Sequence, residues 1–554
     1  MKVKSIEPLK LPYMIMEGCK KCVQNRIDKK IVFILTIFVM MCAYVQAQDN
    51  PVATIYTTDD ADYVGTISFS LSGDEDDFKS VSIDAGYGKK PANDVDEKGN
   101  FRIKGNQIKI YGRFTGLSTP NGRTKNVIFA ENDFIEQISF GHNKLPNAVD
   151  LSANKKLNYV SFLSCGLKNV DFSKFPNTLR EIHLSMNDLV SLNLDRFTDL
   201  ETFYVIENPR LQTVNFKNNK NLKVISVAGN PLIKSVDLSA NNQLEMFEAY
   251  ECGLSQLDLS KNEMLQNLAV YNNNISNIKF GNTENMRILD VRNNKLKTLD
   301  ATKMPLLQSI AVVGNKDLSV LDVTKCPDLM FLYVDSTKIS ELNLSNNPEL
   351  ITLTASAVNT LNKLDISKNI KLETLSIENC QSFTELNVSN NKKLSALIIA
   401  GNKFDFNATK QLVFQLPDMS YATPQQGILG AFLEGSSTEK NQISEASVRL
   451  AETKNWAVGA RNKDGDIVDY PGIATNIENI EKEAGMSILV SDTNIKVINL
   501  PNGNNKKVNI YSTEGKLIKS YITSDNFYVF DRNILTKGVF IVECQGVVAK
   551  SIVN

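Results

Sequence analysis

Residues 286–304 read MRILDVRNNKLKTLDATKM, and the spacing of their apolar residues decides the fold. Apolar and polar residues alternate over two short segments, Leu289–Val291 and Leu299–Ala301, with Asn294 between them. In an extended chain successive side chains point to opposite faces, so each segment has one apolar side. The stretch therefore predicts two short strands joined by an asparagine-containing turn.

The same pattern recurs along the chain at intervals of 21 or 22 residues. The first strand of each unit carries an apolar-x-apolar motif that starts at Ile138, Val160, Ile182, Phe203, Ile225, Phe247, Leu268, Leu289, Ile310, Leu332, Leu353, Leu375 and Leu397. The second carries an apolar-Asp/Asn-apolar-Ser/Thr motif that starts at Val149, Val170, Leu192, Val214, Val236, Leu257, Ile278, Leu299, Leu321, Leu342, Leu364 and Leu386. One unit cannot bury its own apolar side, but stacked units share a continuous core, so the pattern predicts a solenoid.

Written as one unit, the pattern is LxxLxLxxNxLxxLDLSxNxx, which resembles the leucine-rich repeat, and specifically the short repeats of bacterial internalin-type surface proteins. The expected fold class is mainly β: a leucine-rich-repeat solenoid of about 13 repeats of 21–22 residues over residues 118–403. A β-rich N-terminal cap, a mixed C-terminal cap and a C-terminal Ig-like β-sandwich complete it.

Asparagine recurs at two places in each unit, where the chain must turn. An Asn amide can satisfy backbone groups that a buried turn leaves unpaired. The first series is Asn143, Asn187, Asn208, Asn230, Asn273, Asn294, Asn315 and Asn402. The second series is Asn154, Asn219, Asn241, Asn262, Asn347, Asn369 and Asn391.

Cysteine takes four of these turn positions: Cys165, Cys252, Cys326 and Cys380. Thr337 and Val358 replace Asn at two further positions of the first series. Leucine-rich repeats accept Cys at the Asn position, so we expect buried structural thiols. The alternatives are a disulfide, a metal ligand or a nucleophile, but the repeat spacing separates these cysteines by more than the ~7 Å that Cα atoms of a disulfide allow.

The N-terminal residues predict a signal peptide, residues 1–47. Lys29 and Lys30 precede the apolar run IVFILTIFVMMCAY, and small residues follow it. The run is shorter than the ~20 residues that span a bilayer, which favours a cleaved secretory signal. We therefore expect an exported chain with no transmembrane helix once the signal is removed.

Two segments flank the array, because open solenoid ends expose core and need caps. Residues 48–117 alternate like antiparallel strands and predict a β-rich cap domain. Residues 404–472 form the C-terminal cap and linker, with SEASVRLAETKNWAV predicting a helix, then a strand anchored by Trp456. The acidic run 73–77 lacks the ligand spacing of a calcium hand, so we expect a hairpin loop there. Residues 462–466 also hint at calcium, but a turn built from Asn, Asp and Gly is the simpler expectation. We expect no metal and no cofactor.

Residues 473–554 have a different character, with strand-like runs such as NIYSTEGKLI and LTKGVFIV. Together with a late lysine they resemble the type A C-terminal sorting domain of type IX secretion cargo, from which Thr536 and Phe540 depart slightly. The resemblance implies engagement with that secretion machinery, export across an outer membrane and, commonly, attachment to surface lipopolysaccharide. An ordinary Ig-like sandwich that stays on the protein is the alternative. The matching motif residues are Gly515, Lys537, Gly538, Phe540 and Lys550.

Composition excludes several kinds of function. The chain has 61 basic and 62 acidic residues, so its charge balance does not favour nucleic acid. It has only two histidines, and no arrangement of nucleophile, base and orienting acid can be proposed from them. We therefore expect a protein that is not an enzyme.

The sequence places the candidate binding residues on the concave face, between and beside the core positions of each first strand. Tyr and Arg dominate protein interfaces, and Tyr250, Tyr271 and Arg292 occupy consecutive positions of one row, so they should stack. The predicted partner-binding residues are Tyr204, Glu248, Tyr250, Tyr271, Asp290, Arg292, Phe331, Tyr333 and Asp335.

The mature chain as a whole resembles internalin-J-like leucine-rich-repeat surface proteins of Bacteroidetes, of the Porphyromonas type. That resemblance implies a cell-surface or secreted adhesin that binds a protein on host cells, on neighbouring bacteria or on another copy of itself. Biofilm formation, host contact and virulence are the roles it implies. The alternatives are a glycan-binding surface module, an enzyme in the caps, and a structural surface-layer protein.

Overall fold

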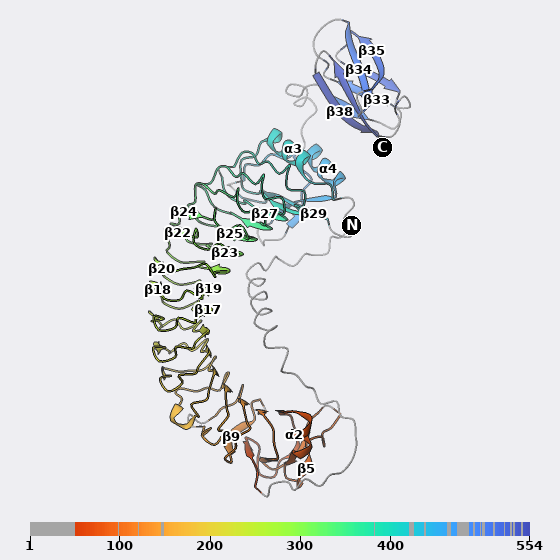
Figure 1. The fold of residues 1–554 in the computed structure, drawn as a ribbon. Helices are drawn as coiled ribbons and strands as arrows, with labels where there is room; N and C mark the ends of the chain where they lie inside the picture. Colours follow the sequence, from red (N-terminus) through yellow and green to blue (C-terminus); the bar gives the residue numbers. More distant parts are fainter. Residues whose placement is uncertain are drawn as a thin grey trace. The chain divides into compact units, whose positions relative to one another are not determined.

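The computed structural model describes residues 50–553 with short gaps (Figure 1). The gaps are residues 98, 120, 146–148, 382, 420–425, 437–438, 463–466, 474–486, 491–493, 499, 501–504, 513–515, 526, 532–534, 536–537 and 545–546. The predicted signal peptide and two predicted sorting residues, Gly515 and Lys537, lie outside the described residues. The described residues form two compact units, the first ending at Tyr470 and the second made mainly of the residues from Pro471 onward.

The first unit is built on one long sheet of short parallel strands, each three residues long in the repeats. Each residue pairs with its equivalent one repeat later: Glu248 with Ala269, and Ala269 with Asp290. This arrangement confirms the predicted mainly-β leucine-rich-repeat solenoid. The repeat strands are β10 (Gln137–Ser139), β11 (Tyr159–Ser161), β12 (Glu181–His183), β14 (Thr202–Tyr204), β16 (Val224–Ser226), β17 (Met246–Glu248), β19 (Asn267–Ala269), β21 (Ile288–Asp290), β23 (Ser309–Ala311), β25 (Phe331–Tyr333), β26 (Thr352–Thr354), β27 (Thr374–Ser376) and β28 (Ala396–Ile398).

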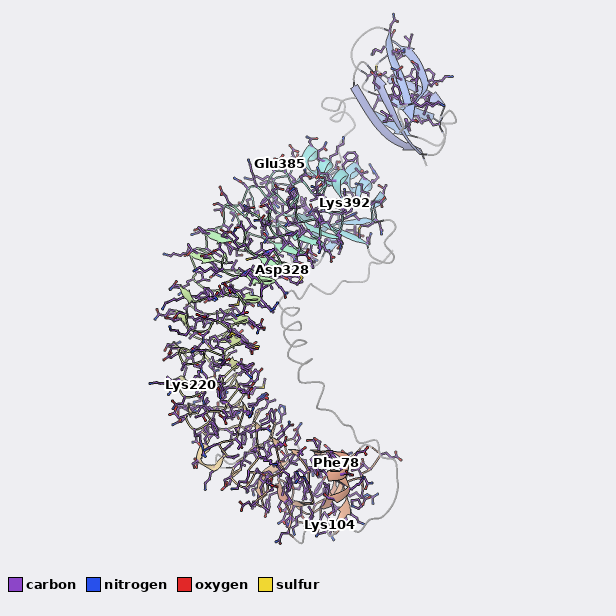
Figure 2. All side chains as sticks on the ribbon, in the orientation of Figure 1. Phe78, Lys104, Lys220, Asp328, Glu385 and Lys392 are labelled. Carbon is purple, nitrogen blue, oxygen red and sulfur yellow. The ribbon has the colours of Figure 1, made fainter. Side chains whose placement is uncertain are left out.

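Two-stranded parallel sheets form on the other side of the array, from residues of the second apolar motif. In Figure 1 the long sheet lies on the inner side of the curved array and these pairs lie on its outer side. Side chains fill the space between the two layers, and Lys220 lies on the outer side (Figure 2). The outer pairs are β13 (Ser191–Asn193) with β15 (Thr213–Asn215), β18 (Leu257–Leu259) with β20 (Ile278–Phe280), and β22 (Thr298–Asp300) with β24 (Val320–Asp322); a 3-10 helix, η1 (Phe172–Lys174), occupies the outer side nearer the N-terminus.

The asparagines act as predicted, joining one repeat to the next inside the turns. Asn294 Nδ2 donates to the carbonyl of Val270 in the preceding repeat (2.9 Å) and to two carbonyls of its own turn, those of Val291 and Arg292. Its Oδ1 accepts the backbone N–H of Ile275 (2.9 Å). One buried side chain therefore satisfies four backbone groups of two repeats.

The cysteines occupy the same positions as buried thiols, which confirms the structural interpretation. Cys252 Sγ donates to the carbonyl of Val227 (3.2 Å), the group that an Asn would reach in the preceding repeat. Burial raises the pKa of the Cys252 thiol to about 11, which keeps it protonated at neutral pH. Every cysteine in the described part of the chain is buried and free of disulfides: Cys165, Cys252, Cys326, Cys380 and Cys544.

An antiparallel domain covers the N-terminal end of the array. Its sheet order is β5-β4-β7-β1-β9, and β8 continues the long sheet by pairing with β10 in parallel and with β3 in antiparallel register. Its elements are β1 (Ala53–Thr57), β2 (Val64–Ile67), β3 (Ser70–Ser72), α2 (Glu75–Ser80), β4 (Ser82–Asp84), β5 (Lys90–Pro91), β6 (Phe101–Lys104), β7 (Gln107–Tyr111), β8 (Gly116–Ser118) and β9 (Thr124–Phe129).

The hairpin loop predicted at residues 73–77 is wrong, because helix α2 begins there. Asp74 is its N-cap, and Asp74 Oδ1 accepts the backbone N–H of Asp77 (2.8 Å). The three acidic residues that follow Asp74 occupy the first turn, where carboxylates favourably face the positive end of the helix dipole. The acidic run is thus a helix start.

Helices and strands cap the other end of the array. As predicted, a helix precedes a strand at Trp456, which is fully buried and donates from Nε1 to the carbonyl of Pro417 (2.8 Å). Asn441 continues the asparagine series into this cap, donating to the carbonyls of Ile399 (2.8 Å) and Ala431 (3.0 Å). The cap elements are α3 (Phe406–Gln415), β29 (Gly427–Leu433), α4 (Glu445–Thr453), β30 (Trp456–Arg461) and β31 (Ile467–Asp469).

The second unit has two antiparallel sheets, ordered β32-β33-β36 and β35-β34-β37-β38, around a hydrophobic core of its own. Of the predicted sorting residues, Gly538 begins β37, Phe540 is buried in the core, and Lys550 pairs with Ile541 across β37 and β38. Its strands are β32 (Ser487–Val490), β33 (Asn494–Ile498), β34 (Lys506–Ser512), β35 (Leu517–Thr523), β36 (Phe527–Asp531), β37 (Gly538–Cys544) and β38 (Val547–Val553).

Candidate functional site

The inner face of the long sheet presents the side chains that do not enter the core. In β17 and the residues after it, Phe247 and Ala249 are fully buried in the core, whereas Glu248 and Tyr250 are half-buried and lie on the inner face. Alternation along an extended chain produces this division. Each repeat therefore adds outward positions to rows that run across the sheet.

The predicted stack in one of these rows is confirmed. The rings of Tyr250 and Tyr271 are parallel within 2° with centroids 4.5 Å apart. The guanidinium of Arg292 lies 4.9 Å from the Tyr271 ring centroid. These three side chains, which we term the tyrosine–arginine stack, are neighbours because their strands are neighbours in the sheet. Aromatic stacking and a cation–π contact stabilise the arrangement beyond simple burial.

Asp290 orients the end of the tyrosine–arginine stack rather than facing solvent. It is only 3% exposed, and its carboxylate accepts hydrogen bonds from Arg292 Nε (2.8 Å) and Nη2 (2.6 Å). A bidentate pair of this kind fixes the plane of the guanidinium. Among the predicted contact residues, Asp290 is therefore a positioning residue.

Glu248 lies next to the stack in the adjoining row. Burial raises the pKa of Glu248, and the nearby hydroxyl of Ser226 acts in the opposite direction. Burial, followed by the charges of Glu248, Glu251 and Glu207, raises the pKa of Tyr250 to about 12. The Tyr250 hydroxyl therefore remains a hydrogen-bond donor at neutral pH, next to a group of carboxylates.

A second aromatic cluster on the inner face contains Tyr204 and His183. The His183 ring lies 4.7 Å from that of Tyr204 and 5.2 Å from that of Tyr159, measured between centroids. Its Nε2 is 2.7 Å from Glu181 Oε1. The His183 side chain therefore contacts two tyrosine rings, and its Nε2 also contacts the Glu181 carboxylate.

The remaining predicted residues lie nearer the C-terminal end of the array. Tyr333 is close enough to Arg292 for the guanidinium charge to oppose the burial that raises the Tyr333 pKa. Asp335 accepts hydrogen bonds from the Thr354 hydroxyl and from the Ser356 backbone N–H (2.8 Å). Phe331 is half-buried in β25 and has no recorded ring contact with the described stack residues.

The predicted set omits Tyr159 and Glu181, although they precede the first core position of their strands in the same way as Phe331, which the set includes. The signal was present in the register: a residue one place before the core position also lies on the inner face. Over the described residues no group of three or more His, Cys, Asp or Glu side chains is placed to hold a metal ion. None of the helices described there has the length and apolarity that a membrane span requires.

The fold is similar to solved leucine-rich-repeat structures at low sequence identity. Internalin J of Listeria monocytogenes, described as including a cysteine ladder, is 16% identical, with 81% of this chain and 93% of that chain covered and a TM-score of 0.45. The Leptospira interrogans protein LIC12759 is 17% identical, over 58% and 89% of the two chains, with a TM-score of 0.42. Internalin F of L. monocytogenes is 14% identical, over 62% and 86%, with a TM-score of 0.35. No family model and no curated protein matches the sequence. The chain is a leucine-rich-repeat solenoid that resembles internalins in fold.

Proposed function

We propose that this chain is a non-enzymatic adhesin that binds a protein partner through the inner face of its repeat array. Leucine-rich-repeat solenoids generally serve as protein-binding modules with extended concave surfaces. The partner is a protein on host cells, on neighbouring bacteria or on a second copy of the chain. Biofilm formation or contact between cell surfaces is the corresponding role.

The tyrosine–arginine stack is the observation that carries this proposal. Stacking holds Tyr250 and Tyr271 rigid before any partner arrives, so binding loses little side-chain entropy. Tyr and Arg are the residue types over-represented among residues that dominate binding energy. A row of prearranged interface residues on a concave sheet favours recognition over a merely structural face.

A glycan-binding module is less well supported by the same geometry. Sugars stack on open ring faces, but Tyr250 covers one face of the Tyr271 ring and Arg292 contacts that ring as well. Tyr271 therefore offers a partner its edge and hydroxyl. Edges and hydroxyls suit polar and apolar contacts with a protein surface.

The direct test replaces both tyrosines with alanine. We expect Tyr250→Ala with Tyr271→Ala to reduce cell adhesion and self-association at least tenfold, because the stack collapses while the core beneath is unchanged. The readouts are adhesion to host cells, biofilm mass and sedimentation of the purified chain. Tyr87→Ala is the matched control, since Tyr87 is an exposed tyrosine of the N-terminal domain, 47% accessible. Unchanged adhesion in a folded double variant would remove the proposal.

Export to the cell surface is the second part of the proposal. Residues 1–47 act as the signal peptide, and residues 473–554 act as a type IX sorting domain. After export the array is either attached to the cell surface or released into the medium. The separate core of the second unit is compatible with a removable domain. Fractionation of cells that carry the intact chain or a chain lacking residues 473–554 tests this. Equal surface delivery of both chains would refute the sorting role.

A further inference from the structure

A cavity of about 450 Å³ lies at the N-terminal end of the long sheet, where β8 pairs with β3. Its walls are the segment from Thr66 to Ser70, the end of β8 with the turn that follows it, and Asn100 just before β6. The volume is within the roughly 300–1,000 Å³ of small-molecule sites. Its lining shares no residue with the tyrosine–arginine stack, so the cavity is a separate feature of the chain.

Uncharged hydrogen-bonding side chains dominate the described lining of this cavity. Small-molecule sites are usually lined mainly by apolar side chains, with a few polar groups that orient the ligand. Here the hydroxyl and amide groups outnumber the apolar side chains, which are those of Ile67 and Phe69. Such a lining suits a ligand that is itself rich in hydroxyl groups. The polar lining residues include Thr66, Ser68, Ser70, Asn100, Ser118 and Asn121.

Several of these groups have hydrogen-bonding capacity left for a ligand. The side-chain hydroxyls of Ser68, Ser70 and Ser118 form no hydrogen bond with another residue in the described part of the chain. Ser70 and Ser118 are also direct cross-strand partners, which places their side chains on the same face of the sheet. Asn100 Nδ2 donates to both carboxylate oxygens of Asp96 (3.2 Å each), so its Oδ1 is left as an acceptor.

The charge of the cavity is balanced within the chain. Arg123 is the one charged residue among the described residues of the lining. Its Nη2 is 2.7 Å from the Asp59 carboxylate, and its Nη1 donates to the Thr66 carbonyl (2.7 Å). The guanidinium also lies 5.1 Å from the centroid of the Tyr63 ring. Because these contacts use the charge of Arg123, the lining favours a neutral ligand over an anion.

The walls of the cavity are held in place by contacts outside it. Phe69 stacks on Phe101 with ring centroids 4.6 Å apart, so one ring face is covered and the Phe69 side chain is fixed. Asn143, the first asparagine of the inner series, donates from Nδ2 to the Thr119 hydroxyl (3.2 Å) and so anchors the turn after β8. A site whose walls are already ordered loses little conformational entropy when a ligand binds.

We propose that this cavity binds a neutral saccharide unit. The hydroxyls of Ser68, Ser70 and Ser118 and the amides of Asn100 and Asn121 would exchange hydrogen bonds with the sugar hydroxyls. The apolar C–H groups of the sugar ring would pack against Phe69. The proposal goes beyond the binding of a protein partner, because it gives the chain a second site of different chemistry.

The test is saturation-transfer difference NMR of the full chain with the methyl glycosides of glucose, galactose, mannose and N-acetylglucosamine as probes. We expect at least one probe to give a signal at its ring C–H protons. Ser68→Trp should abolish that signal, because Ser68 is exposed, lies outside the strands and lines the cavity, so that an indole there takes the place of the sugar. Asn121→Ala should raise the dissociation constant about threefold or more, the effect of losing one uncharged hydrogen bond.

Ser235→Trp is the matched control, since Ser235 is an exposed serine outside the strands and away from the cavity. It should leave the signal unchanged, and far-UV circular dichroism checks that each variant is folded. The absence of signal from every probe, a signal that survives both Ser68→Trp and Asn121→Ala, or displacement of the sugar by inorganic phosphate would overturn the proposal. Loss of the signal in the Tyr250→Ala, Tyr271→Ala variant would place the sugar at the stack and would overturn it too. Loss of adhesion in that variant with the sugar signal retained would support two separate sites.

Discussion

At the scale of single residues, the turns of the array depend on how many backbone groups one side chain satisfies. Asn supplies a donor and an acceptor at the same position, whereas the Cys252 thiol supplies one weak donor at 3.2 Å from Val227 O. Cys is tolerated because it is small and apolar enough to be buried without ionising. The outer series is less well satisfied: the Oδ1 atoms of Asn219 and Asn241 have no partner among the described residues.

This difference predicts how substitutions at the two kinds of position change the free energy of unfolding. Asn294→Ala should lower the free energy of unfolding by about 3 kcal/mol, since it leaves the Ile275 N–H and buried carbonyls unpaired. Cys252→Asn should change it by less than about 1 kcal/mol, because the position already has the geometry of the series. Urea denaturation followed by far-UV circular dichroism measures both. A Cys252→Asn loss as large as that of Asn294→Ala would contradict the equivalence of the positions.

In the candidate site, some side-chain contacts follow from the row that a residue occupies in the sheet, and others do not. Tyr250, Tyr271 and Arg292 were predictable as a stack because one row places equivalent residues at the spacing between strands. The contact of His183 with Tyr159 joins two different rows, so the row pattern alone does not indicate it. The burial of Asp290 was likewise unpredicted, because it depends on where the Arg292 side chain folds back.

At the scale of elements, every repeat turns through a residue in the left-handed region. The residue just before each first-series position has positive φ: Glu251 (54°) before Cys252, Gly314 (75°) before Asn315, and Ala357 (57°) before Val358. Left-handed backbone costs an L-residue roughly 1–2 kcal/mol, and glycine avoids that cost. The array accepts this strain because each turn is held by its neighbours.

Glycine should therefore stabilise a turn that lacks it. Ala357→Gly is expected to raise the free energy of unfolding by about 0.5–1 kcal/mol, the strain relieved exceeding the entropy that glycine adds to the unfolded chain. Gly166→Ala is the reverse control: φ is 67° and no atom lies within 4 Å of an added Cβ, so about 1 kcal/mol of backbone strain is the only cost. Urea midpoints measure both. Destabilisation by Ala357→Gly would show that the turn is not strained.

Element boundaries outside the repeats were harder to predict. The acidic run at residues 73–77 has the composition of a loop, yet Asp74 caps a helix there. The same residue types serve loops and helix starts because both leave backbone N–H groups for side chains to satisfy. Tertiary packing around residues 75–80 decides between them.

At the scale of the whole molecule, the two units have separate hydrophobic cores. Leu289 belongs to the core of the first unit and Ile510 to that of the second. A core that shares no buried residues with another loses its contacts independently.

We therefore expect the intact chain, which contains both units, to unfold in two transitions. Leu289→Ala and Ile510→Ala each remove a fully buried aliphatic side chain, at a cost of about 3 kcal/mol. Each variant should shift one transition and leave the other in place, as measured by differential scanning calorimetry. A single transition that moves with either substitution would show that the units unfold together.

The sequence by itself determined the solenoid, its repeat length and the residues that enter the core, because alternation and a 21–22-residue period leave one way to bury every apolar side. It also determined which side chains share a row on the inner face. The tertiary structure alone decided which of them touch. The Asp290–Arg292 pair and the contact of His183 with Glu181 depend on side-chain torsions and on burial. Side-chain torsions and burial arise from packing between repeats, and they do not appear as a repeated pattern in the sequence.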